Sequence, residues 1–244
     1  ILPMLALAWW LFRKPWQRAA VVMAVILILV CSYLAHQRIF WAVLGLESVV
    51  AIVLMYRGAL IRVKWPLLAA CLLALISMAL LLVLATHEER LAAGDKVTAV
   101  MDEDSRLAHW GRVSAEIARH PLTGAGFGRE AMKKAYPHLV PEQLPLWHPH
   151  NLFLTYGIGM GLPGIAALLW LFASLAREYW RQGHHQDPVR RMAAVVGVVL
   201  LAGLITRNLT NDFFLRDGAL LFWALHGALL GYLSSPSAST SGAA

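Results

Sequence analysis

Residues 146–172 read LWHPHNLFLTYGIGMGLPGIAALLWLF. The polar residues of this stretch crowd its beginning, and no charged side chain interrupts the remainder. A helix needs about 20 predominantly apolar residues to cross the hydrocarbon core of a bilayer. The stretch therefore predicts a membrane-spanning helix with two histidines, His148 and His150, and the amide of Asn151 at its mouth.

The composition extends this prediction to the whole chain. Of its 244 residues, 59% are hydrophobic and 14% are charged, whereas soluble domains carry roughly 25% charged residues. A chain of this length cannot hide so many apolar residues from water. Apolar runs lie at about 1–12, 19–35, 39–56, 66–85, 151–175, 192–209 and 217–233. We therefore predict an all-α fold, a polytopic transmembrane helical bundle.

The net charge of +7 is distributed as in a membrane protein rather than as in a nucleic-acid-binding protein. Basic residues concentrate in alternate loops, which hold Arg13, Lys14, Arg18, Arg57, Arg62, Lys64, Arg177, Arg181, Arg190 and Arg191. The short loops on the other side hold only Arg38, Arg207 and Arg216. The positive-inside rule assigns the first set to the cytoplasm, so we expect no nucleic-acid partner.

The chain divides accordingly into four segments. We predict transmembrane helices over residues 1–85, a large external loop with helices over 86–150, and transmembrane helices over 151–233. Residues 234–244 are small and polar and are expected to form a disordered cytoplasmic tail. The chain opens inside an apolar run, so we expect the first span to be truncated and further spans to precede it.

The external loop contains a predicted helix in DEDSRLAHWGRVSAEIARHP, residues 102–121. Asp and Ser stand near its start and a proline follows its end, as helix boundaries favour. Trp110, Val113 and Ile117 recur at helical spacing and form one apolar stripe. This stripe is expected to face the membrane domain.

The arginines of this helix fall on two sides. Arg106 lies four residues before Trp110 on the apolar stripe, where a buried charge needs a partner. The alternative for Arg106 is a snorkelling side chain whose stem covers apolar surface. Arg112 and Arg119 project to the other side, toward solvent or surface groups.

The sequence PLTGAGFGRE, residues 121–130, comes directly after this helix. Its alternating glycines indicate a tight turn where the backbone comes close to another segment, and a plain connecting turn is the favoured interpretation. A dinucleotide-binding loop is disfavoured, because no strand precedes the glycines and their spacing differs.

Three charged residues lie where a membrane makes charge expensive. Glu47 sits in the middle of an apolar run and predicts a protonated or hydrogen-bonded carboxyl that holds two helices together. Arg38 and Arg207 lie at the outer ends of spans, where a guanidinium either anchors the helix end or binds a phosphate. Asp212 adds a further polar group after Arg207.

The two histidines have three possible roles. A histidine carries its proton near neutral pH and suits general-base chemistry on a hydroxyl. A His-x-His pair also ligates zinc or other transition metals. The third role is structural, with a histidine capping the start of the helix.

Three ordered segments resemble the O-antigen ligase and polymerase superfamily. They are RLAHWGRVSAEIARHPLTGAGFG (106–128), HPHNLFLTYGIGMGLPG (148–164) and NLTNDFFLRDGALLFWALHGALLG (208–231). The resemblance extends from about Arg38 to Tyr232. It implies a GT-C-like fold in the bacterial inner (cytoplasmic) membrane, multi-pass, with the active site facing the periplasm.

The ligase branch resembles the chain best. It implies an inverting glycosyltransferase that moves O-antigen from undecaprenyl diphosphate, among the membrane lipids, to a sugar hydroxyl of the lipid A-core oligosaccharide. No cofactor and no metal are expected. The alternatives are an O-antigen polymerase or a protein O-oligosaccharyltransferase of the same superfamily, a transporter or flippase, and a metal-dependent membrane hydrolase.

The resemblance also implies roles for individual residues. His150 matches the family histidine and is expected to be the general base, with His148 as the neighbouring alternative. Arg106 and Arg38 are expected to bind and neutralise the diphosphate. The other predicted substrate-binding residues are Asn151, Arg207, Asp212 and Arg112.

Overall fold

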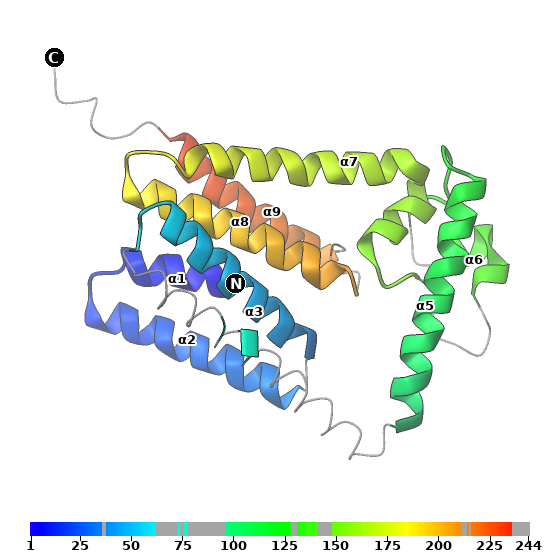
Figure 1. The fold of residues 1–244 in the computed structure, drawn as a ribbon, viewed down its shortest axis with the longest axis horizontal. Coiled ribbons are helices and arrows are strands. Elements are labelled where there is room, and N and C mark those ends of the chain that lie inside the picture. Colours follow the sequence, from blue (N-terminus) through cyan, green and yellow to red (C-terminus); the bar gives the residue numbers. More distant parts are fainter. Residues whose placement is uncertain are drawn as a thin grey trace.

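The computed structural model describes residues 1–35, 38–61, 73, 76–77, 96–127, 131–140, 148–210, 214 and 216–235. Every regular element of these residues is a helix (Figure 1). In chain order the elements are α1 (Leu2–Leu11), α2 (Pro15–Leu34), α3 (Arg38–Arg57), α5 (Lys96–Arg119), α6 (Ala131–Ala135), the 3-10 turn η1 (Pro137–Leu139), α7 (Leu152–Gln182), α8 (Pro188–Asn208) and α9 (Arg216–Ser234). The predicted all-α helical bundle is confirmed.

Among the described residues, α2, α3, α7 and α8 are long and apolar enough to cross a membrane. They coincide with four of the predicted apolar runs, and α1 and α9 coincide with two more. The predicted run 66–85 lies almost wholly outside the described residues. The chain is therefore a multi-pass membrane protein.

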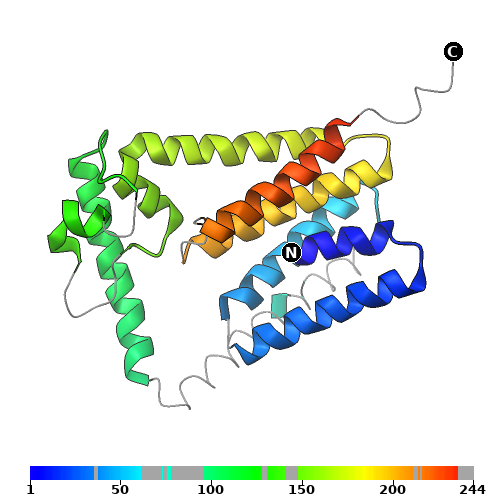
Figure 2. The ribbon, with the colours of Figure 1, turned by 180° about the vertical axis from the view of Figure 1, so that it is seen from behind.

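The bundle is built around α8. This helix contacts α1, α3, α7 and α9, and 56% of its apolar window is buried inside the protein, against 6% for α2. In both views α7 and α2 lie at opposite edges, with the other spans between them (Figure 1; Figure 2). The exposed apolar face of α2 is the surface that a spanning helix turns to lipid.

Small residues let the neighbours of α8 approach closely, as they do in many membrane helix pairs. A Cβ at Gly197 would meet the ring of Tyr179 on α7, and a Cβ at Gly203 would meet the carboxylate of Glu47 on α3. Glu47 thus lies at a contact between two spans, which is where the sequence places it.

The helix α5 stands across one end of the bundle and contacts α7 (Figure 1). Val113 and Ile117 are buried in a cluster that also holds Met132 of α6, Leu139 of η1 and Ile158 of α7. The predicted apolar stripe is therefore confirmed as the face that packs. Full burial of such a side chain contributes roughly 1.5–3 kcal/mol.

A buried carboxylate fastens η1 to α5. Glu116 accepts a hydrogen bond from Arg119 at 3.0 Å and lies 3.4 Å from His120 Nε2 and 3.3 Å from His138 Nε2. His138 comes from η1, so this pairing closes the loop back onto the helix. The exposed Arg119 side chain agrees with its predicted outward direction.

Helix α7 breaks where its sequence carries Gly161 and Pro163. Gly161 has φ 70° and ψ −164°, outside helical geometry. Pro163 has no N–H to donate to the carbonyl four residues earlier, that of Gly159. A helix that breaks inside a membrane-spanning segment needs other hydrogen-bond partners for its free backbone groups.

The glycine turn after α5 supplies those partners. The N–H groups of Ala125 and Gly126 donate to the carbonyls of Ile158 and Gly159, both at 2.8 Å, and Leu162 N–H donates to the Pro121 carbonyl at 2.7 Å. A Cβ at Gly124 would collide with the backbone of Gly159. The predicted close backbone approach is thus confirmed, and the turn does more than connect: it completes the backbone hydrogen bonding of α7.

Candidate active site

The loop His148–Pro149–His150 is fastened to α5 at the mouth of α7. Trp110 Nε1 donates to the Pro149 carbonyl at 2.6 Å. The N–H of His150 donates to His148 Nδ1 at 3.2 Å, and the centroids of the two imidazole rings lie 3.8 Å apart. The stripe residue Trp110 therefore fixes the position of both predicted histidines.

His150 adopts a left-handed backbone conformation, with φ 53°. A residue other than glycine pays roughly 1–2 kcal/mol for this conformation. Such strain persists where the surroundings over-determine it, and it clusters at active sites. The strained backbone therefore makes His150 a candidate active-site residue, independently of the chemistry of its side chain.

Asn151 joins the start of α7 to the end of α8. Its Oδ1 accepts from the N–H groups of Phe153 and Leu154, at 3.0 and 3.2 Å, and its Nδ2 donates to the Leu209 carbonyl at 2.9 Å. The helix cap that the sequence offered to a histidine is made by Asn151, the residue type preferred there. Neither histidine is therefore needed to cap α7.

The hydrogen bonds at the two ends of the bundle agree with the distribution of basic residues along the sequence. Asn151 and Leu209 join α7 and α8 at the histidine end. At the other end, Arg191 donates to the Gly58 carbonyl after α3 at 2.6 Å, and Arg190 donates to the carbonyl of Leu233 in α9 at 3.0 Å. The basic loops thus meet at one end and the histidines lie at the other.

His109 is a third imidazole at this site, and sequence reasoning missed it. It is fully buried, and neither ring nitrogen has a hydrogen-bond partner among the described residues. The available signal was spacing, because His109, Val113 and Ile117 occur at intervals of four along the buried face. A polar ring at that spacing signals a buried polar group.

Burial keeps the imidazoles neutral. It lowers the pKa of His109 from 6.5 to about 4, with Arg112 and His150 adding to the effect. It lowers the pKa of His148 to about 4 as well, with contributions from His150 and His109. At neutral pH these two rings are uncharged, so they do not repel a nearby guanidinium.

The predicted arginines are distributed around this end. Arg112 is exposed on α5 and close enough to His109 to act on its pKa. Arg207 lies in the last turn of α8, two residues before Leu209. Arg38 begins α3 and Arg106 lies within α5, but their side chains fall outside the described residues, as does Asp212 altogether.

Arg207 lines two cavities within the bundle. The larger has a volume of about 470 Å³ and lies among α1, α2, α3 and α8, with Glu47 on its wall. The smaller, of about 220 Å³, adds Asn208 and His226 to the lining. Both are walled mainly by apolar side chains, so Arg207 and Glu47 are ionisable groups beside an apolar space.

In the described part of the chain, no three His, Cys, Asp or Glu side chains are placed to hold one metal ion. The three imidazoles are therefore arranged as a packed cluster around α5 and the α7 mouth rather than around a common ligand position.

These observations define a multi-pass helical membrane protein with imidazoles held at one end of its bundle, between α5 and the ends of α7 and α8. The chain belongs to the O-antigen ligase family, whose model matches residues 23–169, more than half of the chain. Members are membrane glycosyltransferase-like enzymes, and the family has an O-antigen ligase or polymerase type of function. No curated protein and no solved structure is significantly similar to the chain.

Proposed function

We propose that the protein is an O-antigen ligase, which transfers O-antigen from undecaprenyl diphosphate to a sugar hydroxyl of the lipid A-core. The proposal places it in the bacterial inner membrane with the histidine end in the periplasm, because the basic loops gather at the opposite end. The observation that carries it is the braced His148–His150 pair, fastened by Trp110 on α5 and neighboured by Asn151, which is bonded to the end of α8.

His150 acts in this proposal as the general base. The acceptor hydroxyl attacks the anomeric carbon of the donor, and an imidazole nitrogen takes the hydroxyl proton. General-base assistance is typically worth 10²–10⁴-fold in rate. The ring of His148, tilted against that of His150, and the buried ring of His109 are neutral at neutral pH, so neither places a positive charge beside this base.

Arginines carry the other half of the reaction. The carbon–oxygen bond to the diphosphate breaks as the new glycosidic bond forms, so negative charge builds on the departing group. Arg38, Arg106 and Arg207 are assigned to stabilise that charge, which fixed donors do most effectively in a water-poor site. The cavity beside Arg207 combines an apolar lining with a guanidinium, which suits a lipid-linked diphosphate. A single displacement of this kind inverts the anomeric centre.

The test is transfer by the purified protein. The protein is given an undecaprenyl diphosphate-linked glycan with lipid A-core, with a serine-containing peptide, or with no added acceptor, each in the presence of EDTA. We expect transfer to the core alone, undiminished by EDTA. Elongation of the glycan would identify a polymerase, transfer to peptide a protein glycosyltransferase, and loss with EDTA a metal-dependent enzyme.

A further inference from the structure

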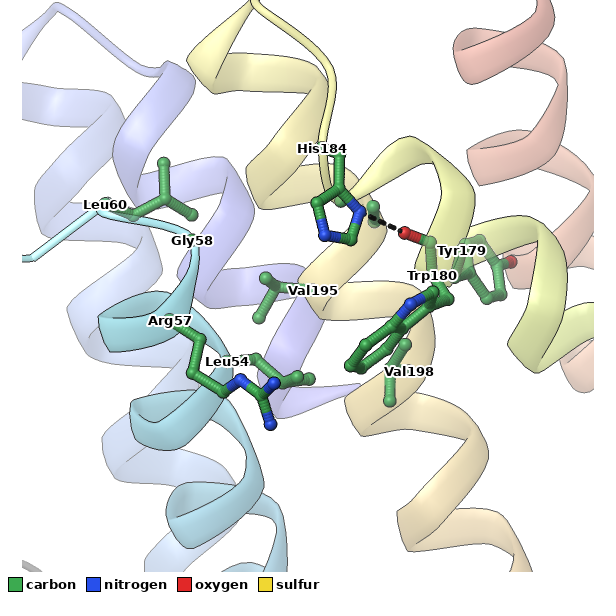
Figure 3. A pocket seen from close by; sticks show the side chains of 11 residues that line it. Leu54, Arg57, Gly58, Leu60, Tyr179, Trp180, His184, Val195 and Val198 are labelled. Atoms are coloured by element: carbon green, nitrogen blue, oxygen red, sulfur yellow. Dashed lines mark hydrogen bonds between the residues drawn. The ribbon is translucent and has the colours of Figure 1, made fainter.

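A second pocket lies at the opposite end of the bundle from the histidines. It has a volume of about 180 Å³ and is enclosed by the end of α3, the end of α7 and the start of α8 (Figure 3). Its floor is apolar, with Leu54, Val195 and Val198, and its rim is polar, with Arg57, Trp180 and His184. No step of glycan transfer uses these residues.

The walls of this pocket are fixed by interactions between helices. Arg191 of α8 donates to the Gly58 carbonyl and so holds the end of α3 against α8. Tyr179, which is fully buried, lies 2.7 Å through its hydroxyl from His226 Nδ1 of α9 and packs against Gly197. The pocket is therefore a feature of the packed bundle rather than a gap between mobile side chains.

The rim is electropositive and amphipathic. The Arg57 guanidinium lies 5.7 Å from the centre of the Trp180 ring, a cation–π arrangement. His184 Nδ1 pairs with the Trp180 carbonyl at 3.0 Å, and its ring lies across the pocket from the guanidinium (Figure 3). An arginine fork and an imidazole at the edge of an apolar floor match a phosphate that carries a hydrocarbon chain.

The surrounding charges favour an anion. The nearby acidic groups are already engaged: Glu178 pairs with Arg181 on the same helix at 3.0 Å, and Asp187 caps α8 by accepting from Val189 N–H at 2.9 Å. Arg57, Arg190 and Arg191 are among the positive charges that remain at this end. Basic pockets between membrane helices on the cytoplasmic side bind anionic headgroups.

We propose that this pocket binds an anionic membrane phospholipid, with the headgroup phosphate between Arg57 and His184 and an acyl chain over Leu54, Val195 and Val198. A lipid fits better than a soluble phosphate, because the floor is apolar and Trp180 is half exposed at the end of a spanning helix. Amphipathic tryptophan side chains are enriched at this depth of a membrane protein.

The test counts bound lipid by native mass spectrometry. The purified protein is titrated in detergent with phosphatidylglycerol and, separately, with phosphatidylcholine. Arg57→Gln should weaken phosphatidylglycerol binding about ten-fold, the loss of a hydrogen bond to a charged group, while phosphatidylcholine binds weakly to both proteins. The matched control is Arg13→Gln, because Arg13 is exposed in the basic loop between α1 and α2 and does not line the pocket; phosphatidylglycerol binding by this variant should be unchanged.

A second variant tests the pocket independently, in case the Arg57→Gln protein does not fold. Val198→Phe fills the apolar floor while every charge stays in place, and it should also weaken phosphatidylglycerol binding. Equal binding by wild type and both pocket variants would overturn the proposal, as would equal binding of the two lipids. Displacement of phosphatidylglycerol by inorganic phosphate at comparable concentration would overturn it too, and would show a soluble-anion site instead. Since no glycan transfer is measured, the result is independent of the proposed ligase activity.

Discussion

His150 and its neighbours form a site in which backbone and side chains constrain one another. The left-handed backbone of His150, the ring of His148 against it and the Trp110 bond to Pro149 each limit where the His150 imidazole lies. The sequence identified the two histidines by their place at the mouth of a span. It did not identify His109, because a neutral ring one turn from Val113 carries no charge to distinguish it from the apolar stripe.

The buried ring of His109 makes folding depend on pH. Its pKa is about 4 in the folded protein against an ordinary value of 6.5, so the unfolded chain takes up the proton first as the pH falls. The stability that His109 contributes is fully present above about pH 6.5. It is lost as the pH drops toward about 4, by at most roughly 1.4 kcal/mol per pH unit.

Thermal unfolding of the purified protein between pH 7 and pH 5 measures this dependence. The melting temperature should fall with pH, and the fall should be smaller in His109→Leu, which has nothing to titrate at that position. Identical slopes for the two proteins would show that His109 is not a buried neutral ring.

At the scale of elements, apolar run length predicted the spans well, because a bilayer imposes one length on every helix that crosses it. It could not predict the break in α7. The backbone groups that satisfy the broken part of α7 belong to Ala125, Gly126 and Pro121, in the segment that follows α5 and is distant from the break in sequence. The only signal in that segment is the spacing of its glycines. A hydropathy pattern contains no record of which backbone carbonyl meets which N–H.

Glycine substitutions test this backbone junction. Gly161→Ala forces a side chain into a left-handed conformation and places its Cβ 2.6 Å from the Pro121 carbonyl oxygen. We expect a loss of roughly 1–3 kcal/mol in unfolding free energy. The matched control is Gly111→Ala on α5, where a Cβ meets nothing within 4 Å and should stabilise the helix by up to about 1 kcal/mol. Chemical unfolding in detergent measures both, and equal effects would mean that the junction does not constrain α7.

The whole molecule has two chemically different ends. Loops rich in arginine close one end through Arg190 and Arg191, and the imidazole cluster lies at the other. Counting Lys and Arg predicted this separation, since the charge rule acts on loops that can be read directly from the sequence. Which arginines reach the imidazoles depends on side-chain packing between distant helices, and counting cannot supply it.

Labelling with a membrane-impermeant maleimide tests the orientation. In a background with Cys31 and Cys71 replaced by serine, Ser114→Cys on the exposed face of α5 should react in cells whose outer membrane alone is permeabilised. Arg181→Cys, at the basic end, should react only after the inner membrane is opened. The reverse pattern would place the histidine end in the cytoplasm and exclude a periplasmic reaction.

The most direct measurement of the central claim is glycan transfer to lipid A-core by His150→Ala, with donor binding measured on the same preparation. We predict that transfer falls by at least about 10²-fold, the contribution of a general base, while affinity for the undecaprenyl diphosphate-linked glycan is unchanged. Transfer near the wild-type rate in a folded His150→Ala protein would contradict the assignment of His150 as the base.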